Sequence, residues 1–305
     1  TLTERVTDHL AVRPSHLPRQ RMWKVRARQV VLAQGAHERP LVFSGNDLPG
    51  VMLSGAVRTF INRYGVVPGN RCVVFTNNDD GYRTALSLQQ GGVEAVIVDL
   101  RHEVRSALIK MAKEAGIRIM TGHAVTIASG TQRIARVEIS PVNEDATRVL
   151  DYPVHMDCDL LAMSGGLSPA VHLHSQARGK LAWDEELLCF KPKSVHEACF
   201  NAGACNGVFG LAKAMADGLK AGAAAVRACG LDAGDHLPPV VTAPPQNWRP
   251  MPAWKIPNGQ PEGEGPKAFV DFQNDVTASD NYGPYIQIQL YAAAASHPAS
   301  RQVRQ

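Results

Sequence analysis

The sequence lacks the features that would assign it to several large classes of protein. No apolar run reaches the 18 or more residues of a membrane span, and Thr1–Arg5 does not read as a signal peptide. The net charge is only +4 over 305 residues and no long basic run occurs. We therefore expect a cytoplasmic protein with neither a membrane nor a nucleic acid as its partner.

Cysteine is scarce and shows no metal-binding pattern. The six cysteines include no C-x-x-C pair, and most stand in apolar segments. We expect them to be reduced and buried, without a zinc or iron–sulfur site. No Ser/His/Asp or Cys/His arrangement rises above chance, so we expect no catalytic residue on this chain. The hydrophobic fraction of 45% is sufficient for a full-sized core.

The most informative stretch is Val73–Ala85, which reads as a buried strand running into a helix. A dinucleotide-binding fold carries G-x-G-x-x-G at this place, and here the pattern is T-N-N-D-D-G. Glycine in the first two positions lets the backbone turn tightly and approach a pyrophosphate. Thr76 and Asn78 replace them, while Asp79 and Asp80 add negative charge. We expect the strand–helix unit to form and the pyrophosphate site to be lost.

Around this unit, apolar strands alternate with amphipathic helices, the first of which is closed by Gly65. Such alternation predicts a parallel sheet with right-handed crossovers. The expected helices are 53–64, 82–90 and 103–114, and the expected strands are 71–75, 95–99 and 117–120.

After residue 124 the hydrophobic period changes to two, which predicts an antiparallel meander with strands at 125–128, 134–139 and 149–154. A buried strand over 157–166 ends in Gly165-Gly166. A short strand from Cys199 then enters a turn rich in glycine and alanine, followed by a long helix over 209–229. Proline is frequent in 231–266, which predicts a linker or a surface-wrapping arm.

This order of elements resembles the two-dinucleotide-domain flavoproteins of glutathione-reductase type. Four segments resemble more specifically the α subunits of heterotetrameric sarcosine oxidases, and the similarity covers roughly residues 1 to 280. The segments are 34–40 (QGAHERP), 74–79 (VFTNND), 164–176 (SGGLSPAVHLHSQ) and 267–277 (KAFVDFQNDVT).

The resemblance implies an α/β fold of the FAD/NAD(P)-binding class. It would contain a doubly wound parallel sheet, a nested second Rossmann-like βαβ domain, an antiparallel meander and a Pro-rich C-terminal arm. Residues 1–43 would be the C-terminal part of the first half of a dinucleotide-binding domain, whose N-terminal strand is missing. Residues 44–165 would form the nested, degenerate NAD-like domain, and 166–230 would return to the first domain. Residues 231–305 would be a Pro-rich linker and a truncated or divergent C-terminal segment.

Two departures from the family concern the ends of the chain. The family's N-terminal ferredoxin-like domain and its first strand with an intact G-x-G-x-x-G are absent from this sequence. Residues 281–305 do not resemble the family's folate-binding domain, which is similar to the glycine-cleavage aminomethyltransferase. We therefore expect a fragment or a frame-altered end, the alternative being a divergent tail.

The resemblance also implies a function. Such a complex oxidises sarcosine to glycine, with formaldehyde or methylene-tetrahydrofolate and hydrogen peroxide as further products. The α subunit would hold NAD⁺ non-covalently, FMN would lie at the α/β interface, FAD would belong to the β subunit, and tetrahydrofolate only to the missing C-terminal domain. Partners would be the β, γ and δ subunits and a small-molecule amine. The alternatives are the α subunit of a related amine, opine or proline dehydrogenase, and a non-catalytic assembly subunit.

By the same resemblance, two segments match walls of the NAD⁺ site. One is the strand-end turn in which Gln34 replaces a usual threonine, and the other is the turn in which Ala204 replaces a usual aspartate. Small residues permit close approach, and the helix N-terminus that follows favours phosphate oxygens. Strand–helix packing without a ligand is the alternative for both. The expected cofactor-binding residues are Ala33, Gln34, Gly35, Ala202, Gly203, Ala204, Gly207 and Phe209.

Three further groups of side chains invite a functional interpretation. Asp99 stands where an intact site would bind the ribose, but an ordinary strand-end carboxylate is preferred. His172 and His174 are spaced for one strand face and could bind a metal, although packing with an internal hydrogen bond is favoured. The triplet 37–39 (HER) could form an interdomain ion pair or contact a cofactor phosphate through Arg39.

Overall fold

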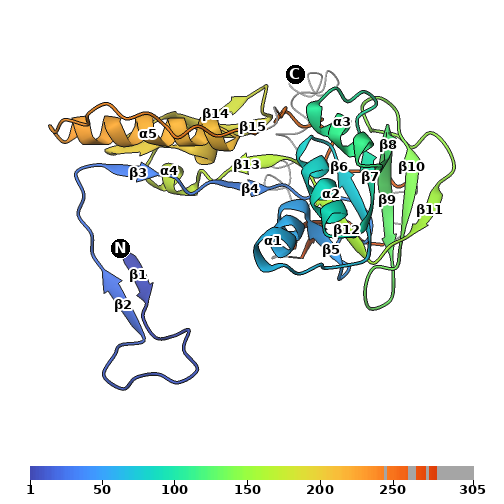
Figure 1. The fold of residues 1–305 in the computed structure, drawn as a ribbon, viewed down its shortest axis with the longest axis horizontal. Helices are drawn as coiled ribbons and strands as arrows, with labels where there is room; N and C mark the ends of the chain where they lie inside the picture. Colours follow the sequence, from blue (N-terminus) through green and yellow to red (C-terminus); the bar gives the residue numbers. More distant parts are fainter. Residues whose placement is uncertain (244–245, 260–265, 273–274, 280–305) are drawn as a thin grey trace.

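The computed structural model describes residues 1–243, 246–259, 266–272 and 275–279. Its centre is a five-stranded parallel sheet in the order β5-β12-β6-β7-β8 (Figure 1). Helices α1, α2 and α3 cover one face of this sheet. The strands are β5 (Val51–Leu53), β12 (Leu160–Ser164), β6 (Arg71–Thr76), β7 (Glu94–Asp99) and β8 (Arg118–Thr121), and the helices are α1 (Ser54–Tyr64), α2 (Asp80–Gln90) and α3 (Ala107–Glu114).

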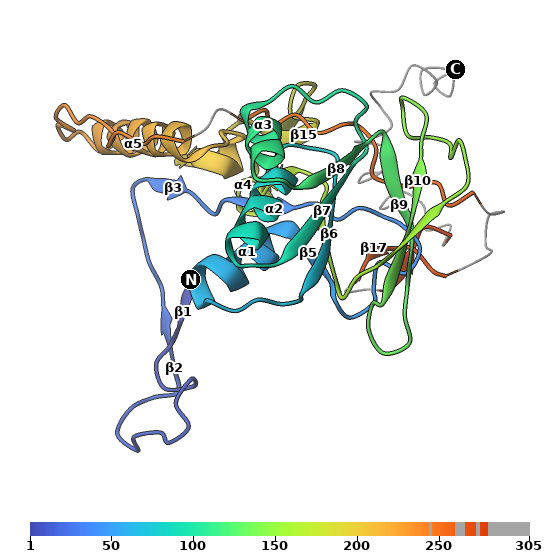
Figure 2. The ribbon, with the colours of Figure 1, turned by 45° about the vertical axis from the view of Figure 1, so that its right-hand side comes forward.

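A three-stranded antiparallel sheet covers the other face (Figure 2). It contains β9 (His123–Ser129), β10 (Arg136–Pro141) and β11 (Val154–Asp157) in the order β11-β10-β9. The side chains of β6 explain the layering. Val73 and Phe75 pack toward the antiparallel sheet, whereas Cys72 and Val74 pack under the helices. Because both faces are buried, β6 reads as a continuous apolar run.

The expected α/β architecture, with a parallel sheet and an antiparallel meander, is confirmed, and most element boundaries agree within two residues. Gly65 ends α1, as predicted, and takes the left-handed conformation. Helix α3 begins at Ala107 and not at residue 103. Ser106 is its N-cap, with the hydroxyl accepting a bond from Ile109 N–H, and the capping side chain fixes the start of the helix.

The third strand of the meander is displaced from its expected position at 149–154. The strand that pairs with β10 is β11, and Val149 forms only an isolated bridge with Val142. The cause is a wide turn held by Asn143, whose side-chain oxygen accepts bonds from the N–H groups of Thr147 and Arg148. A side chain that bonds local backbone in this way competes with strand pairing.

The remaining elements form an elongated part beside the two sheets with helices α1–α3, which together are called the nested domain below (Figure 1). Two parallel strands, β3 (Val30–Leu32) and β16 (Cys199–Asn201), pair in register and lie beside the long helix α5 (Leu211–Ala228). Strand β4 (Ala36–Glu38) pairs with β13 (Leu167–Pro169), and these two strands connect the part to the nested domain. The other elements are β1 (Leu2–Arg5), β2 (Gln20–Trp23), α4 (His172–Gln176), β14 (Lys180–Asp184), β15 (Cys189–Ser194), the 3₁₀ helix η1 (Gly203–Asn206), β17 (Phe269–Asp271) and β18 (Val276–Thr277).

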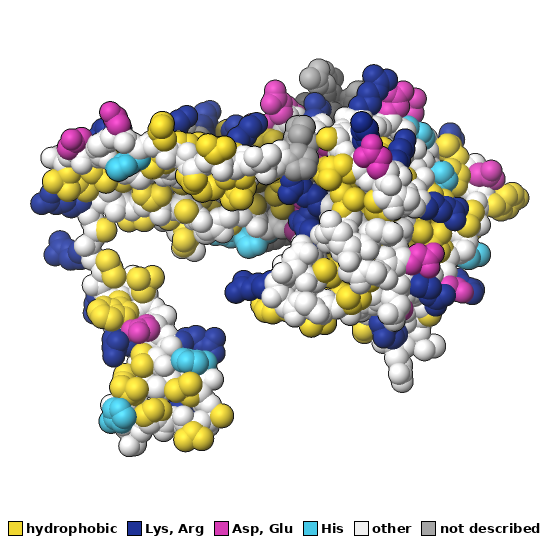
Figure 3. All heavy atoms as spheres, in the orientation of Figure 1, with side chains coloured by type: hydrophobic (Ala, Val, Ile, Leu, Met, Phe, Trp, Pro, Cys, Tyr) yellow, Lys and Arg dark blue, Asp and Glu magenta, His cyan; other side chains and the backbone are white. Residues whose placement is uncertain are grey.

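This elongated part has unusually exposed apolar residues. Val30 is 45% exposed and Val31 is 39% exposed, although parallel strands normally lie covered on both faces. Within α5 only Ala221 is buried. Figure 3 shows hydrophobic side chains along this projecting part and on the N-terminal hairpin β1–β2. The division of the chain into four parts stays a prediction.

Part of the Pro-rich region packs into the hydrophobic core, whereas the sequence predicted a linker or a surface-wrapping arm. After α5 the chain returns along the helix, and residues 246–256 then pack against the nested domain (Figure 1). Ala253, Trp254 and Ile256 belong to the hydrophobic core. Val42 N–H donates to Trp254 O, and Ile256 N–H donates to Val42 O. The predicted divergent segment 281–305 lies outside the described residues.

Candidate functional site

The two segments expected to line the cofactor site meet at one edge of the elongated part. Because β3 and β16 are parallel, their carboxyl ends lie together, which places 33–35 next to 202–207. Ala202 N–H donates to Leu32 O at 2.9 Å, and the Cys205 thiol lies 3.0 Å from the same oxygen. The fold therefore brings the two sequence-predicted segments to a common edge.

The first segment turns sharply at Gly35, whose φ of +84° is a left-handed conformation. Gly35 O accepts a bond from Ala170 N–H, and the Gln34 amide donates to Ala170 O at 2.6 Å. Gln34 thus fastens the turn to the chain after β13. A Cβ at Gly35 would meet no atom within 4 Å, so this side of the turn is open. Ala33 and Gln34 are exposed.

The second segment is a 3₁₀ turn whose amides are engaged by a residue that the sequence analysis missed. Asp217 of α5 accepts bonds through Oδ2 from Gly203 N–H at 2.8 Å and from the Asn206 amide at 3.2 Å. Gly203 and Gly207 both have positive φ, whereas Ala204 carries no polar group. One signal was available in the sequence, since Asp217 is the only acidic residue of α5.

Phe209 is buried and lies at the entry to α5. Its ring is 5.6 Å from that of Trp248, measured between centroids. Gly210 follows as the N-cap of α5, with φ of +89° and no side-chain capping bond. The N-terminal amides of α5 are thus presented beside the 202–207 turn without a capping side chain, which is an arrangement that favours anions.

At the nested domain, the degenerate turn after β6 is closed by its own side chains. Thr76 Oγ1 accepts a bond from Asn78 N–H at 3.1 Å, and Asn78 Oδ1 accepts one from Asp80 N–H at 2.8 Å. Gly81 is the only glycine retained from the pattern. A Cβ at Gly81 would lie 2.6 Å from Thr76 Cβ, so the residue keeps the helix close to the strand.

The two aspartates of this turn are paired with arginines. Asp79 and Asp99 both bond to Arg101, each at 2.8 Å, and Asp80 bonds to Arg58 at 2.6 Å. Burial lowers the pKa of Arg101, but the bonds to Asp99 and Asp79 outweigh burial and raise its pKa overall. The charge that was expected to repel phosphate is therefore neutralised within the protein.

Asp99 ends β7, as expected, and its carboxylate is fully engaged in the interior. It accepts bonds from the Tyr82 hydroxyl and from the backbone and guanidinium of Arg101. Burial and the neighbouring Asp99 raise the pKa of Tyr82. The preferred interpretation, an ordinary strand-end carboxylate, agrees with these contacts.

The histidine pair does not lie on a strand. His172 and His174 belong to the short helix α4, where they point in different directions because two residues span about 200° of a helix. His174 is fully buried between Lys180 O, at 3.1 Å, and the Asn201 amide, at 3.1 Å. The favoured role in packing with an internal hydrogen bond agrees with the contacts of His174, whereas His172 is exposed and contacts the ring of His37. Among the described residues, no group of three or more His, Cys, Asp or Glu side chains could hold a metal ion.

Among the described residues the 37–39 triplet forms no ion pair within 4 Å, although Arg58 attracts Glu38 electrostatically. Glu38 Oε2 instead accepts a bond from Gly55 N–H in the first turn of α1. Arg39 donates to the carbonyl oxygens of Leu188 and Leu167, and its guanidinium lies 4.5 Å from the ring centroid of Trp254. Burial lowers the pKa of Arg39 to about 10. A guanidinium engaged in this way supports the domain contact and is not presented to a phosphate.

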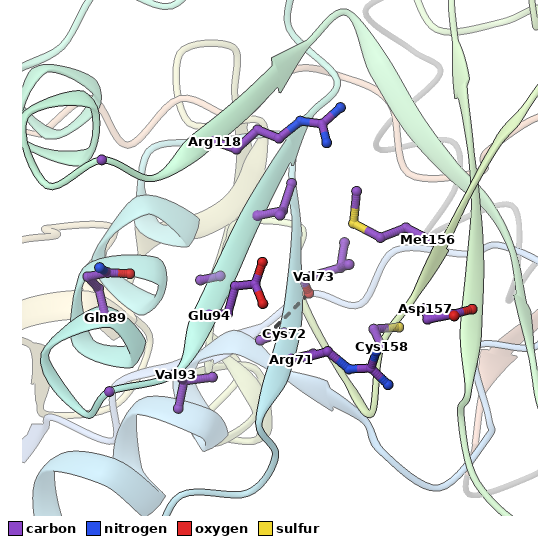
Figure 4. Close-up of a pocket in the computed structure, with 14 residues that line it drawn as sticks. Arg71, Cys72, Val73, Gln89, Val93, Glu94, Arg118, Met156, Asp157 and Cys158 are labelled. Carbon is purple, nitrogen blue, oxygen red and sulfur yellow. Dashed lines mark hydrogen bonds between the residues drawn. The ribbon is translucent and has the colours of Figure 1, made fainter.

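Two cavities lie at opposite ends of the parallel sheet. One, of about 570 Å³, opens at the amino ends of β6 and β7, where Arg71, Glu94, Arg118 and Asp157 surround it (Figure 4). The other, of about 580 Å³, opens at the carboxyl ends, between Arg101–Arg105 and Asn247–Pro252. Ligands of open α/β sheets bind outside the carboxyl ends of the strands, and at this end residues 247–252 of the chain itself form one wall of the second cavity.

The described cysteines are free thiols, and all are buried except Cys229, which is partly exposed. This agrees with the expected reduced state. Over the part of the chain that the structure describes, no helix combines the length and apolar character needed to cross a membrane.

No family model matches the sequence. The chain is 41% identical over 266 residues to the alpha subunit of sarcosine oxidase from Corynebacterium sp. (strain P-1), covering 86% of this chain and 27% of that protein. It is 38% identical over 282 residues to the alpha subunit of sarcosine oxidase from Rhizobium meliloti (strain 1021), covering 91% and 26%. The resemblance predicted from the sequence is confirmed, and the chain spans about a quarter of the length of these curated relatives.

More distant similarity extends to other oxidoreductases. An opine oxidase subunit of Agrobacterium tumefaciens (strain Ach5) is 24% identical over 185 residues, covering 57% of this chain and 37% of that protein. Among solved structures, the thioredoxin reductase of T. acidophilum superimposes with a TM-score of 0.50 at 16% identity, covering 66% of this chain and 64% of that one. At this identity the likeness concerns the fold, and it supports the predicted reductase-type α/β class.

Proposed function

We propose that this chain is a segment of the α subunit of a sarcosine oxidase-type complex and that it supplies a non-catalytic NAD⁺-binding scaffold there. The support is the similarity to two such subunits over 86% and 91% of the chain. The β, γ and δ subunits would be its partners, and the cytoplasm its compartment. A small amine, sarcosine, would be the substrate of the assembled complex.

In this proposal the oxidation takes place outside the described residues. FMN at the α/β interface and FAD on the β subunit would supply the redox chemistry that converts sarcosine, water and O₂ to glycine, formaldehyde and hydrogen peroxide; with tetrahydrofolate as the one-carbon acceptor, methylene-tetrahydrofolate would form in place of formaldehyde. Tetrahydrofolate would be bound by a further domain. The residues of this chain would hold NAD⁺ in place and take no part in proton transfer.

One observation carries the assignment of the NAD⁺ site: the parallel pairing of β3 and β16 places 33–35 and 202–207 at one carboxyl edge. Three features fit a dinucleotide there. Gly35 leaves one side of its turn open, and a Cβ at Gly203 would meet only Ala214, at 3.6 Å. The uncapped N-terminus of α5 at Gly210 suits phosphate oxygens. Ala33, Gln34, Ala202, Ala204, Gly207 and Phe209 complete the proposed wall.

The test is Gly203→Val in the complex purified after co-expression with its partner subunits. The branched side chain would stand where the backbone must approach the ligand, so NAD⁺ content should fall sharply while flavin content is unchanged. Turnover should fall only as far as assembly does, because the proposed NAD⁺ is structural. Gly230→Val is a matched control, since Gly230 also has positive φ and open space around it but lies at the far end of α5.

Two outcomes would contradict the assignment. Full NAD⁺ content in the Gly203→Val complex would make 202–207 a packing turn. Loss of FMN with NAD⁺ intact would instead move this turn to the interface with the partner subunits.

A non-catalytic assembly subunit without a nucleotide is the second candidate, because one observation favours it. The Asp217 carboxylate already occupies Gly203 N–H, a group that would otherwise be free for a ligand. NAD⁺ content of the unmodified complex separates the two proposals, since an assembly subunit would contain none.

A further inference from the structure

The carboxyl edge of the nested sheet has a topological switch point between β6 and β12. In the sheet, β7, the next strand along the chain, lies on one side of β6, and β12 and β5 lie on its other side. Open α/β sheets bind their ligands in the crevice at such a point. The structure shows what lies at this point in the present chain.

The crevice is covered by residues 246–256 of the chain itself. Met251 N–H donates to Asn77 O at 2.8 Å, and the Asn77 side-chain amide donates to Met251 O at 3.0 Å and to Ala253 O at 3.1 Å. On the β12 side, Trp254 Nε1 donates to Gly165 O at 2.6 Å. The segment is therefore bonded to the ends of both strands that flank the switch point.

The segment also engages the charged residues of the degenerate turn. Asn247 N–H donates to Asp79 Oδ2 at 3.2 Å, while Arg101 holds Asp79 Oδ1. The Gln246 amide lies 3.4 Å from Asp80 Oδ1. The acidic side chains of the degenerate turn thus accept hydrogen bonds from the covering segment.

Apolar packing completes the closure. Pro250 lies against Gly166, with its Cβ 3.2 Å from the position that a Gly166 Cβ would take. Trp254 is buried beneath the Arg39 guanidinium. The small residues after β12, which in a nucleotide-binding domain allow a ligand to approach the backbone, here allow the protein chain to approach.

We propose that residues 246–256 are a permanent, built-in occupant of the nested dinucleotide site. The segment takes the position of the cofactor, with Asn77 and Gly165 as its anchors, and Asp79 and Asp80 have become part of its docking surface. The nested domain is then closed to NAD(P) by the protein's own chain. This inference does not depend on a dinucleotide at the 33–35 and 202–207 edge.

Hydrogen–deuterium exchange of the full chain, read by mass spectrometry, tests the proposal. Backbone amides of 246–256 should exchange slowly, and added NAD⁺ or NADPH should leave the exchange of 246–256 and of 76–82 unchanged. The dinucleotides would be used at about 1 mM, the upper end of the usual KM range.

Two variants address the anchors separately. Asn77→Asp keeps the shape of the side chain but removes both donated bonds and places a carboxylate against two carbonyl oxygens. Exchange over 246–256 should become at least about tenfold faster, because two hydrogen bonds are lost, while β7 is unaffected. Trp254→Phe keeps most of the bulk and removes only the bond to Gly165, so it should give a smaller increase. Asn62→Asp, at an exposed position of α1, is the matched control.

Two results would overturn the proposal. The first is exchange of 246–256 in the unmodified chain at the rate of an unstructured peptide. The second is faster exchange of 246–256 on adding a dinucleotide, together with protection of 76–82, which would make the segment a displaceable cover. Failure of the proposed NAD⁺ site at 33–35 and 202–207 would give a different result: added NAD⁺ would not slow hydrogen exchange in 199–210, and the purified complex would contain no NAD⁺.

Discussion

The phenol of Tyr82 donates a 2.8 Å hydrogen bond to the carboxylate of Asp99, and both side chains are fully buried. The bond connects the first turn of α2 to the carboxyl end of β7. A dinucleotide-binding domain uses an acidic residue at this strand end to bind ribose hydroxyls. Here the Asp99 carboxylate joins α2 to β7, and its oxygens accept hydrogen bonds from Tyr82 and Arg101 of the protein itself.

Replacing Tyr82 with phenylalanine should therefore destabilise the nested domain. The change removes one hydrogen bond to a charged group, and such bonds contribute about 1.5–3 kcal/mol. Urea unfolding followed by circular dichroism would give the free energy of unfolding. Tyr64→Phe, at a residue that is 60% exposed, should have almost no effect. Equal losses in the two variants would contradict the role assigned to the Tyr82–Asp99 bond.

Glu38 should make stability fall as the pH rises. Burial, with a contribution from Asp80, raises the pKa of Glu38 from 4.5 to about 7. Below pH 4.5 the carboxyl is protonated in both states. Between pH 4.5 and 7 the unfolded chain loses this proton while the folded chain keeps it, so stability decreases. Above pH 7 the decrease is complete, at about 3 kcal/mol.

Glu38→Gln should remove this contribution. Relative to the variant, the unmodified chain should lose up to about 3 kcal/mol of unfolding free energy between pH 5 and pH 8. Urea unfolding at the two pH values measures the difference. Glu114→Gln, at an exposed carboxylate on α3, controls for the general effect of removing a charge. A parallel pH dependence in the Glu38 variant and the unmodified chain would show that this carboxyl does not carry the effect.

Gly81→Ala should be destabilising by about 1–3 kcal/mol, as expected for an added methyl group in a packed contact. The new Cβ would lie 2.6 Å from Thr76 Cβ. Gly218→Ala in α5 is a control of opposite sign, because a Cβ there meets no atom within 4 Å and alanine stabilises a helix interior by about 0.5–1 kcal/mol. Thermal unfolding should thus separate the two variants in opposite directions from the unmodified chain. If Gly81→Ala left the unfolding temperature unchanged, β6 and α2 could move apart without loss of stability.

The elongated part should unfold before the nested domain. Val30 and Val31 are exposed, and α5 buries only Ala221, so few apolar contacts hold β3, β16 and α5 together. Segments of this kind open with low free energy. Hydrogen exchange should be faster in 30–32 and 199–201 than in 72–75. Equal protection of these strands would show that the chain unfolds as a single unit.

Much of the nested domain was predictable from sequence because its signals are local. The apolar run of β6, the period of α1 and the terminal Gly65 each specify an element without help from distant residues. Where a side chain controlled the boundary, as Ser106 does for α3 and Asn143 does for the meander, the hydrophobic pattern alone placed the element incorrectly.

The candidate site was predictable only in part, since its remaining partners are distant in sequence. The pattern at Thr76–Gly81 indicated that the phosphate site is lost, but Asn77 finds its partners at Met251 and Ala253, 174 and 176 residues away. Asp217 is singled out in the sequence as the only acidic residue of α5, but the helical pattern does not show that it reaches Gly203. No periodicity reports such pairings, because they depend on the tertiary packing of the chain.

The burial of Trp254 gives the protein an optical reporter. Its indole is held by Gly165 O and lies beside the Arg39 guanidinium, in contrast to Trp23, which is 49% exposed on the N-terminal hairpin. An indole shielded from water emits at shorter wavelength than a hydrated one. The chain has four tryptophans, so the part of the short-wavelength emission that Trp254→Phe removes reports, on the timescale of a stopped-flow mixing experiment, whether the region around Trp254 is intact.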